Sequence, residues 1–174
     1  MQASESNAAT RSLSRVLHSG ADGVTVITFA AQLRDEFRRL NVAWLERYFT
    51  VEPIDERVLD DPENEILAAG GEILFAQREG EVVGTVALRV ADADSVELTK
   101  MAVDERWQGR GYGQVLLETA IQLARDLGKR RVILYSQRSL KAAIALYYKN
   151  GFADMPGPLD GKYARCNVQM EKWL

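Results

Sequence analysis

The hexapeptide Gln108-Gly109-Arg110-Gly111-Tyr112-Gly113 is the segment of this chain whose composition points most directly to chemistry. It follows VELTKMAV at 96–103, which is typical of a β-strand, and it precedes an amphipathic stretch typical of a helix. Glycines leave backbone N–H groups uncovered, and the first turn of a helix adds free N–H groups and a partial positive charge. A strand, a glycine loop and a helix N-terminus together predict a site for a phosphate or diphosphate.

Two common phosphate-binding motifs do not fit this segment. Walker A requires Gly-Lys-Ser/Thr at its end, whereas Gly113 is followed by Gln114 and Val115. The dinucleotide motif requires a third glycine three residues after the second, and counting from Gly111 reaches Gln114. The pattern therefore excludes ATP-type and NAD-type sites and favours another diphosphate ligand.

The glycine loop and a second stretch resemble the GNAT superfamily of N-acetyltransferases. ELTKMAVDERWQGRGYG at 97–113 resembles the family's motif A, and AAIALYYKNGF at 142–152 resembles its motif B, in the expected order and at the expected distance. The order of elements agrees with the family from Val24 onward. The resemblance implies that acetyl-CoA is the cosubstrate, that residues 108–113 hold its pyrophosphate, and that no metal takes part. It also implies that the backbone of Met101, Ala102 and Val103 holds the pantetheine arm.

Two side chains are candidate catalytic groups by this resemblance. Tyr147 occupies the position of the tyrosine that protonates the CoA thiolate in many family members, and a phenol with a pKa of about 10 suits that task. The alternative is a packing role on its helix. Glu97 lies where some members place a base, often acting through water. Alternatively, the Glu97 side chain is exposed to solvent or pairs with Lys100.

One position departs from the family pattern. Many members have an asparagine seven residues before the tyrosine, where it contacts the pantetheine, and this chain has Leu140. Ser136 and Ser139 are the candidates to replace that contact. Arg110 is expected either to reach a phosphate or to be solvated.

The remaining composition bounds the function further. One cysteine and one histidine, Cys166 and His18, exclude a disulfide framework and a Cys/His zinc site, and Cys166 is expected in the core. The net charge of −3 argues against general nucleic-acid binding, and no apolar run approaches the roughly 20 residues of a membrane span. We therefore expect a cytoplasmic protein, and the resemblance is compatible with a homodimer.

The hydrophobic periodicity predicts an α/β (α+β) fold. Its sheet is mixed, mostly antiparallel, of about six to seven strands flanked by helices, as in the acyl-CoA N-acyltransferase fold. Expected strands cover 24–29, two segments within 70–90, 95–103, 130–136 and 163–174; expected helices cover 29–48, 114–127 and a segment from its N-cap Ser139 to Lys149. The acidic connector at 52–65 is expected to be a loop or short helix. Residues 1–23 are expected to be a flexible tail and residues 24–174 a single domain.

The resemblance implies transfer of an acetyl group from acetyl-CoA to a primary amine of a small molecule, amino acid or peptide, by direct attack in a ternary complex. Trp44, Tyr48 and Phe49 beside the acidic connector favour a cationic acceptor. Arg165 and Asn167, on the polar face of the last expected strand, favour an acceptor with a carboxylate. Both alternatives stay open, and so does a rival function, a non-catalytic acyl-CoA-binding regulatory module.

Overall fold

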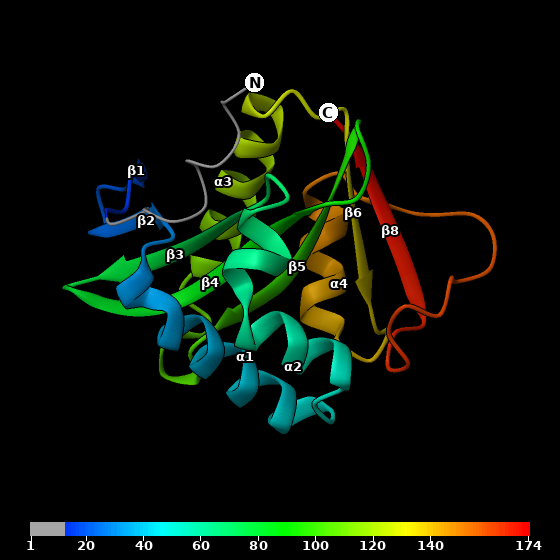
Figure 1. Ribbon diagram of the computed structural model, residues 1–174, viewed down its shortest axis with the longest axis horizontal. Helices are drawn as coiled ribbons and strands as arrows, with labels where there is room; N and C mark the ends of the chain where they lie inside the picture. Colours follow the sequence, from blue (N-terminus) through cyan, green and yellow to red (C-terminus); the bar gives the residue numbers. More distant parts are fainter. Residues whose placement is uncertain (1–12) are drawn as a thin grey trace, which may run out of the picture.

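A mixed β-sheet runs through the molecule and is flanked by helices (Figure 1). The computed structural model describes residues 13–174. The strands are β1 (Val16–Ser19), β2 (Val24–Thr28), β3 (Glu72–Arg78), β4 (Glu81–Val90), β5 (Ser95–Val103), β6 (Arg131–Ser136), β7 (Ala153–Asp154) and β8 (Val168–Trp173). The helices are α1 (Arg34–Tyr48), α2 (Pro53–Asp60), α3 (Tyr112–Asp126) and α4 (Lys141–Lys149), with the short helical turns η1 (Ala31–Leu33), η2 (Glu63–Leu67) and η3 (Glu105–Trp107).

The strand order is β1-β2-β3-β4-β5-β6-β8-β7, and every neighbouring pair is antiparallel except β5 with β6. Parallel neighbours require a crossover connection, which α3 supplies between β5 and β6. The predicted fold class is thus confirmed. The sheet has eight strands rather than six or seven, because β1 and the two-residue β7 were not expected.

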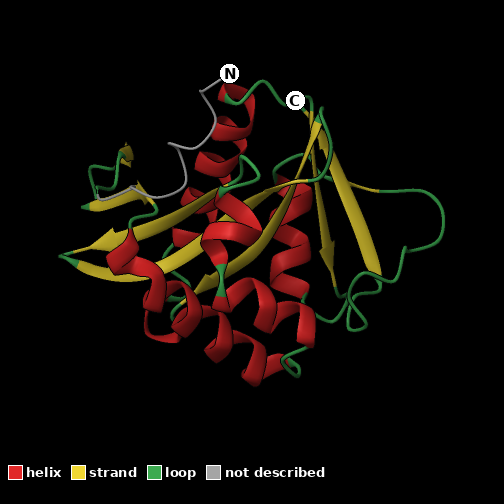
Figure 2. Cartoon of the chain, viewed as in Figure 1, coloured by secondary structure: helices red, strands yellow, loops and turns green. Residues whose placement is uncertain are grey.

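Helices α1 and α2 cover one face of the sheet, and α3 and α4 cover the other (Figure 2). Alternate strand residues point to opposite faces, so each inner strand contributes to two apolar clusters. In β3, Ile73 and Phe75 pack with α1 and α2, whereas Leu74 packs with α3 and α4. Burial on both faces explains why the inner strands are almost continuously apolar.

The prediction of a flexible tail over residues 1–23 is wrong for part of this range. Residues Val16–Ser19 form β1, which pairs with β2 in antiparallel register, for example His18 opposite Val26. An edge strand of four residues needs few buried apolar side chains, and Val16 is exposed, so composition alone concealed this strand. Residues 1–12 of the expected tail lie outside the described residues.

Two expected boundaries near the C-terminus also differ. Leu140 is the N-cap of α4, and none of the side chains within 13–174 caps this helix, whereas the backbone N–H of Ser139 donates to Gln137 Oε1 at 2.7 Å. The last strand begins at Val168, and the preceding residues form turns. Arg165 therefore does not lie on the polar face of a strand. Its guanidinium donates instead to Glu52, the N-cap of α2, and to Asp55 of α2.

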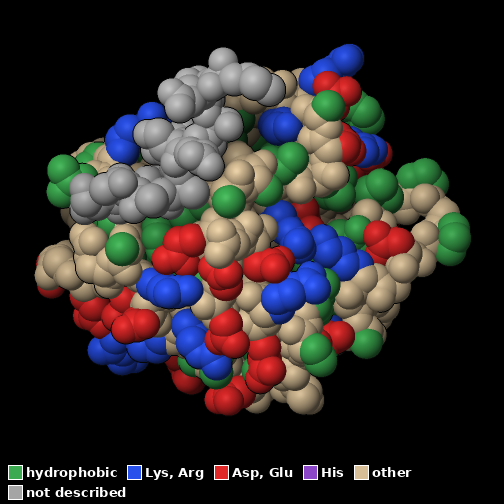
Figure 3. Space-filling view, in the orientation of Figure 1, with side chains coloured by type: hydrophobic (Ala, Val, Ile, Leu, Met, Phe, Trp, Pro, Cys, Tyr) green, Lys and Arg blue, Asp and Glu red, His purple; other side chains and the backbone are tan. Residues whose placement is uncertain are grey.

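The acidic connector contains α2 and η2. A capping box starts α2, since the Glu52 side chain accepts from the N3 backbone and Asp55 accepts from the Glu52 N–H. Several of its carboxylates face arginines of α1: Arg34 lies 3.3 Å from Glu63. Acidic and basic side chains alternate over this face of the molecule (Figure 3). The connector's negative charge is therefore largely balanced.

The two parallel strands part after three residue pairs. Pairing of β5 with β6 runs from Ser95–Arg131 to Glu97–Ile133, although both strands continue. Beyond this point β5 carries a bulge: its register with β4 shifts, and Lys100 has a left-handed φ of 53°. A bulge bends its strand and breaks the ladder locally. The sheet therefore opens between β5 and β6.

Candidate active site

A cavity of about 870 Å³ lies at the opening between β5 and β6, within the size range of small-molecule sites. Predicted site residues in its wall are Glu97, Met101, Ala102, Val103, Gln108, Gly109, Gly111, Tyr112, Gly113 and Tyr147. Arg110 does not line it. One cavity thus gathers residues that come from β5, the glycine loop and α4.

The glycine loop presents bare backbone to this cavity. Gly109 and Gly111 have φ values of 75° and 86°, and a Cβ at either position would meet nothing within 4 Å. Gly111 is the N-cap of α3 and supplies no side-chain cap, so first-turn N–H groups lack a side-chain acceptor. Gln108 Nε2 donates to the carbonyl of Val103 at 3.1 Å and ties the loop to the end of β5. This geometry fits an anionic group.

Trp107 lies beside the loop and carries an unused donor. Its Nε1 is buried and has no hydrogen-bond partner within residues 13–174, and the side chain lines the cavity. A buried unpaired donor is costly unless a ligand accepts a hydrogen bond from it. The Arg110 guanidinium stacks on the Trp107 ring, 4.7 Å from its centroid. The phosphate contact expected of Arg110 stays a prediction.

Tyr147 lies on the α3 and α4 side of the sheet. It is 8% exposed, and its ring packs against Phe152 with centroids 5.8 Å apart. Burial raises the pKa of Tyr147 to about 12, so the phenol keeps its proton at neutral pH. Its surroundings therefore suit both the packing role and the acid role; Leu140 and Ser139 line the same cavity.

Glu97 lies on the opposite face, since its neighbours Val96 and Leu98 belong to the cluster of α3 and α4. The Glu97 residue is 2% exposed, and each of its carboxylate oxygens has a partner. The Tyr163 hydroxyl donates to Oε1 at 2.7 Å, and the Lys162 ammonium pairs with Oε2. Glu97 does not hydrogen-bond to Lys100, the partner considered from the sequence.

Lys100 instead pairs with Asp55 of α2, with Nζ 2.6 Å from Oδ1. Arg165 donates two hydrogen bonds to the same Asp55 carboxylate, at 2.7 and 3.0 Å, and a third to Glu52 at 2.7 Å. This Asp55 cluster (Glu52, Asp55, Lys100, Arg165) joins α2, the bulge in β5 and the segment before β8. Arg165 is therefore committed within the protein rather than free for a substrate carboxylate.

Charge and burial oppose each other in the Asp55 cluster. Burial alone would raise the pKa of Asp55, but the hydrogen bonds from Arg165 and the charge of Lys100 outweigh it and lower that pKa. Burial lowers the pKa of Lys100, and Asp55 offsets this only in part. The ionised Asp55 carboxylate is therefore stabilised by folding.

The aromatic group at the end of α1 lines the cavity as well. Trp44 stacks near Tyr48 and Phe49, with centroids 5.3 and 5.7 Å apart. Cys166 was expected in the core, but it is half-buried and lines the cavity, because the last strand starts later. Burial raises the pKa of the Cys166 thiol to about 11, which leaves little reactive thiolate at neutral pH.

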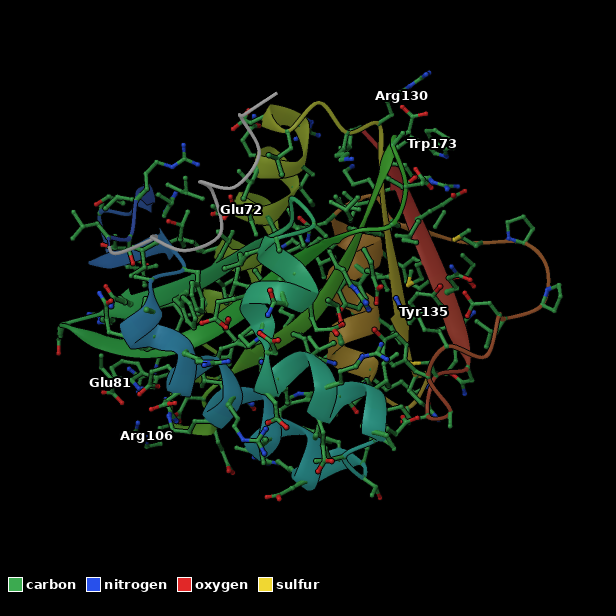
Figure 4. All side chains as sticks on the ribbon, in the orientation of Figure 1. Glu72, Glu81, Arg106, Arg130, Tyr135 and Trp173 are labelled. Atoms are coloured by element: carbon green, nitrogen blue, oxygen red, sulfur yellow. The ribbon has the colours of Figure 1, made fainter. Side chains whose placement is uncertain are left out.

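Several residues of the site were not singled out from the sequence. Asp55 was counted only within an acidic run, and Lys100 only as a partner for Glu97. Lys162, Tyr163 and Tyr135 carried no motif; Tyr135 lies on β6 and is labelled in Figure 4. A lysine inside an otherwise buried strand was the one available signal, since such a charge needs a buried partner.

Within residues 13–174 no three His, Cys, Asp or Glu side chains are grouped so as to hold a metal ion. His18 is exposed on β1. Over the same residues, no helix has both the length and the apolar character to cross a membrane.

Comparison with known proteins extends these observations. The model of the acetyltransferase (GNAT) family matches residues 32–152. N-acetyltransferase 8 of Rattus norvegicus is 35% identical over 88 residues, covering 48% of this chain and 40% of that protein. Mycothiol acetyltransferase of Cellulomonas flavigena is 32% identical over 146 residues, covering 75% and 41%. The matched regions thus span less than half the length of these relatives.

Solved structures show the same fold. A GNAT-family acetyltransferase of Staphylococcus aureus Mu50 superposes with a TM-score of 0.77 at 20% identity, covering 86% of this chain and 98% of that one. The PaiA N-acetyltransferase of Thermoplasma acidophilum, in complex with coenzyme A, gives a TM-score of 0.67 at 21% identity, covering 87% and 99%. The family model that matches residues 32–152 confirms the resemblance to the GNAT superfamily predicted from the two motifs.

The substitution Asp55→Asn tests the Asp55 cluster. The substitution keeps the shape of the side chain but leaves the buried Lys100 ammonium without its ion-pair partner and Arg165 with Glu52 alone. The free energy of unfolding should therefore fall by roughly 3 kcal/mol in urea denaturation at pH 7. The pKa of Asp55 is lowered by folding, so its stabilisation is complete above its ordinary pKa of about 4 and is lost as the pH falls through the folded value. The difference between variant and wild type should therefore shrink in acid.

Asp60→Asn is the matched control, because Asp60 forms an exposed ion pair with Arg38. This substitution should lower the free energy of unfolding by less than about 1 kcal/mol. Equal losses for the two variants would contradict a special role of Asp55.

Proposed function

The chain belongs to the GNAT family of acetyltransferases, and from this premise we propose that it transfers an acetyl group from acetyl-CoA to a primary amine by direct attack in a ternary complex. The observation that carries the proposal is the single cavity between β5 and β6, which reaches Tyr147 on one face of the sheet and Glu97 on the other. Such an opening lets a cosubstrate and an acceptor approach each other from opposite faces.

The residues around the cavity fit coenzyme A. The bare backbone at Gly109 and Gly111, at the start of α3, suits the pyrophosphate, and Trp107 Nε1 offers a further donor. Backbone groups of 101–103, at the open edge of β5, suit the amide-rich pantetheine arm. This assignment supports the proposed role of residues 108–113, including Arg110, whose guanidinium lies over the Trp107 ring beside the loop.

The proposed reaction forms one bond and breaks one. The neutral amine nitrogen attacks the thioester carbonyl, the carbon–sulfur bond breaks, and the products are an amide and the free thiol of CoA. Tyr147 supplies the proton that the departing thiolate takes up. Burial keeps the phenol protonated until that step, and the raised pKa, about 12, makes it a weaker acid than a free phenol. The proton lost by the amine passes to Glu97 or to water. Tyr147 then regains a proton from solvent.

The proposed function is tested with two measurements on the same protein. Calorimetry should show binding of acetyl-CoA, and thiol release should appear with at least one primary amine from a panel of polyamines, amino acids and peptides. Binding without thiol release for any amine would favour the non-catalytic acyl-CoA-binding module. Absence of binding would contradict both functions.

Gly111→Ala should raise the Kd for acetyl-CoA about tenfold in calorimetry, which corresponds to about 1.4 kcal/mol. The added methyl group opposes the left-handed φ and stands between the backbone and the ligand. Gly128→Ala is the matched control, because Gly128 also has a positive φ, 72°, but lies beyond α3 and away from the cavity. The same Kd in both variants would remove the glycine loop from cosubstrate binding.

Tyr147→Phe should lower kcat by about 100-fold while leaving the Kd for acetyl-CoA within twofold, because only the proton donor is lost. The neighbouring Tyr148→Phe serves as control, since its hydroxyl is bound to Asp154 on the surface and does not line the cavity. An unchanged kcat in the first variant would assign Tyr147 to packing alone.

A further inference from the structure

The side chain of Lys162 reaches a residue in the wall of the proposed active site, Glu97, from outside the sheet. It belongs to the long segment between β7 and β8, yet its ammonium pairs with the buried Glu97. The rings of Tyr135 and Tyr163 flank that ammonium, with centroids 5.5 and 5.4 Å away. Glu97, Tyr135 and Tyr163 all line the cavity. An alkylammonium is thus held in a box of one carboxylate and two aromatic rings, which we call the ammonium box.

The ammonium box has the chemistry of a binding site for a cationic amine. A carboxylate and aromatic faces are the groups that recognise alkylammonium ions. The box also holds the residue proposed to receive the proton of the acceptor amine. An ammonium bound to Glu97 gives one proton to that carboxylate and becomes the neutral amine that attacks, and the proton released on amide formation passes to water. The nitrogen in contact with Glu97 is therefore at the position of the acceptor. Lys162 occupies that place with a group of the same chemistry.

The box stays satisfied if one ammonium replaces another. Tyr163 holds Glu97 Oε1 at 2.7 Å, so only the contact to Oε2 would be exchanged. The segment that carries Lys162 has anchors on its far side, because Arg165 is bound to Asp55 and Glu52. The preceding residues 155–161 contain neither helix nor strand. Asp160 ties this segment to the box, since the Tyr135 hydroxyl donates to Asp160 Oδ2 at 2.6 Å and the Lys162 N–H donates to Oδ1 at 3.0 Å. Rotation of the Lys162 side chain alone is therefore enough to empty the box, and the Asp55 cluster stays in place.

We propose that Lys162 is a built-in pseudosubstrate: its ammonium occupies the acceptor subsite, and a primary amine on an unbranched alkyl chain, of the lysine or polyamine kind, displaces it. This inference rests on the proposed function. The commitment of Arg165 to two carboxylates supports a cationic acceptor over one recognised by its carboxylate. Self-occupancy lowers the apparent affinity for the acceptor by the fraction of molecules in which the box is free.

The experiment compares wild type with Lys162→Met, which keeps the length of the side chain and removes its charge. With n-butylamine as the probe, calorimetry should show a Kd about tenfold lower in the variant, as expected if Lys162 fills the box about 90% of the time. The Kd for acetyl-CoA should not change. Lys172→Met is the matched control, because Lys172 lies on β8 and does not line the cavity, and it is Lys162 that pairs with Glu97. This variant should bind n-butylamine as wild type does.

A Kd for n-butylamine that is unchanged or higher in Lys162→Met, in a variant that melts as wild type does, would overturn the proposal. If Lys162→Met is poorly folded, an NMR titration of the wild-type protein tests the proposal instead. The NMR signal of the Lys162 Cε group should shift toward that of a solvated lysine as n-butylamine is added, and a signal that does not move would overturn the proposal. Tighter binding in the variant without thiol release from either protein would instead contradict the proposed function and leave the ammonium box standing.

Discussion

The parting of β5 from β6 is the constraint on which the site depends. Pairing ends at Glu97 and Ile133, and the bulge at Lys100 turns β5 away before its last residues. A continuous ladder would have closed the sheet and separated its two faces. With the ladder open, the glycine loop and Tyr147 meet the same cavity as Glu97. One irregularity in the backbone thus creates a passage between two otherwise independent layers.

Buried charge holds the open sheet together on the α2 side. Lys100 needs a counter-ion because the bulge leaves it almost without solvent, and Asp55 supplies it from the capping box of α2. Arg165 pairs with Glu52 and with Asp55, so that two cations face two carboxylates. These ion pairs hold the segment before β8 over the cavity. The segment then places Lys162 on Glu97. Stability and access to the site are therefore linked through a few ion pairs.

The sequence predicted what local pattern encodes. Alternation and helical spacing predicted the inner strands and α1 and α3, and the glycine spacing predicted a loop of exposed backbone at the start of α3, since these depend on neighbours in the chain. Contacts between distant segments left no such pattern: Asp55 with Lys100 and Lys162 with Glu97 are visible only after folding. Edge strand β1 and the cavity position of Cys166 were missed because they depend on partners and on where β8 begins.

The central claim is that the opening between β5 and β6 is where the cosubstrate meets the acceptor. A crystal structure with coenzyme A tests it most directly. The account predicts the pyrophosphate at the backbone of Gly109 and Gly111, the pantetheine along 101–103, and the sulfur between Tyr147 and the ammonium box. Coenzyme A bound elsewhere, or a sulfur that lies away from the opening, would contradict it.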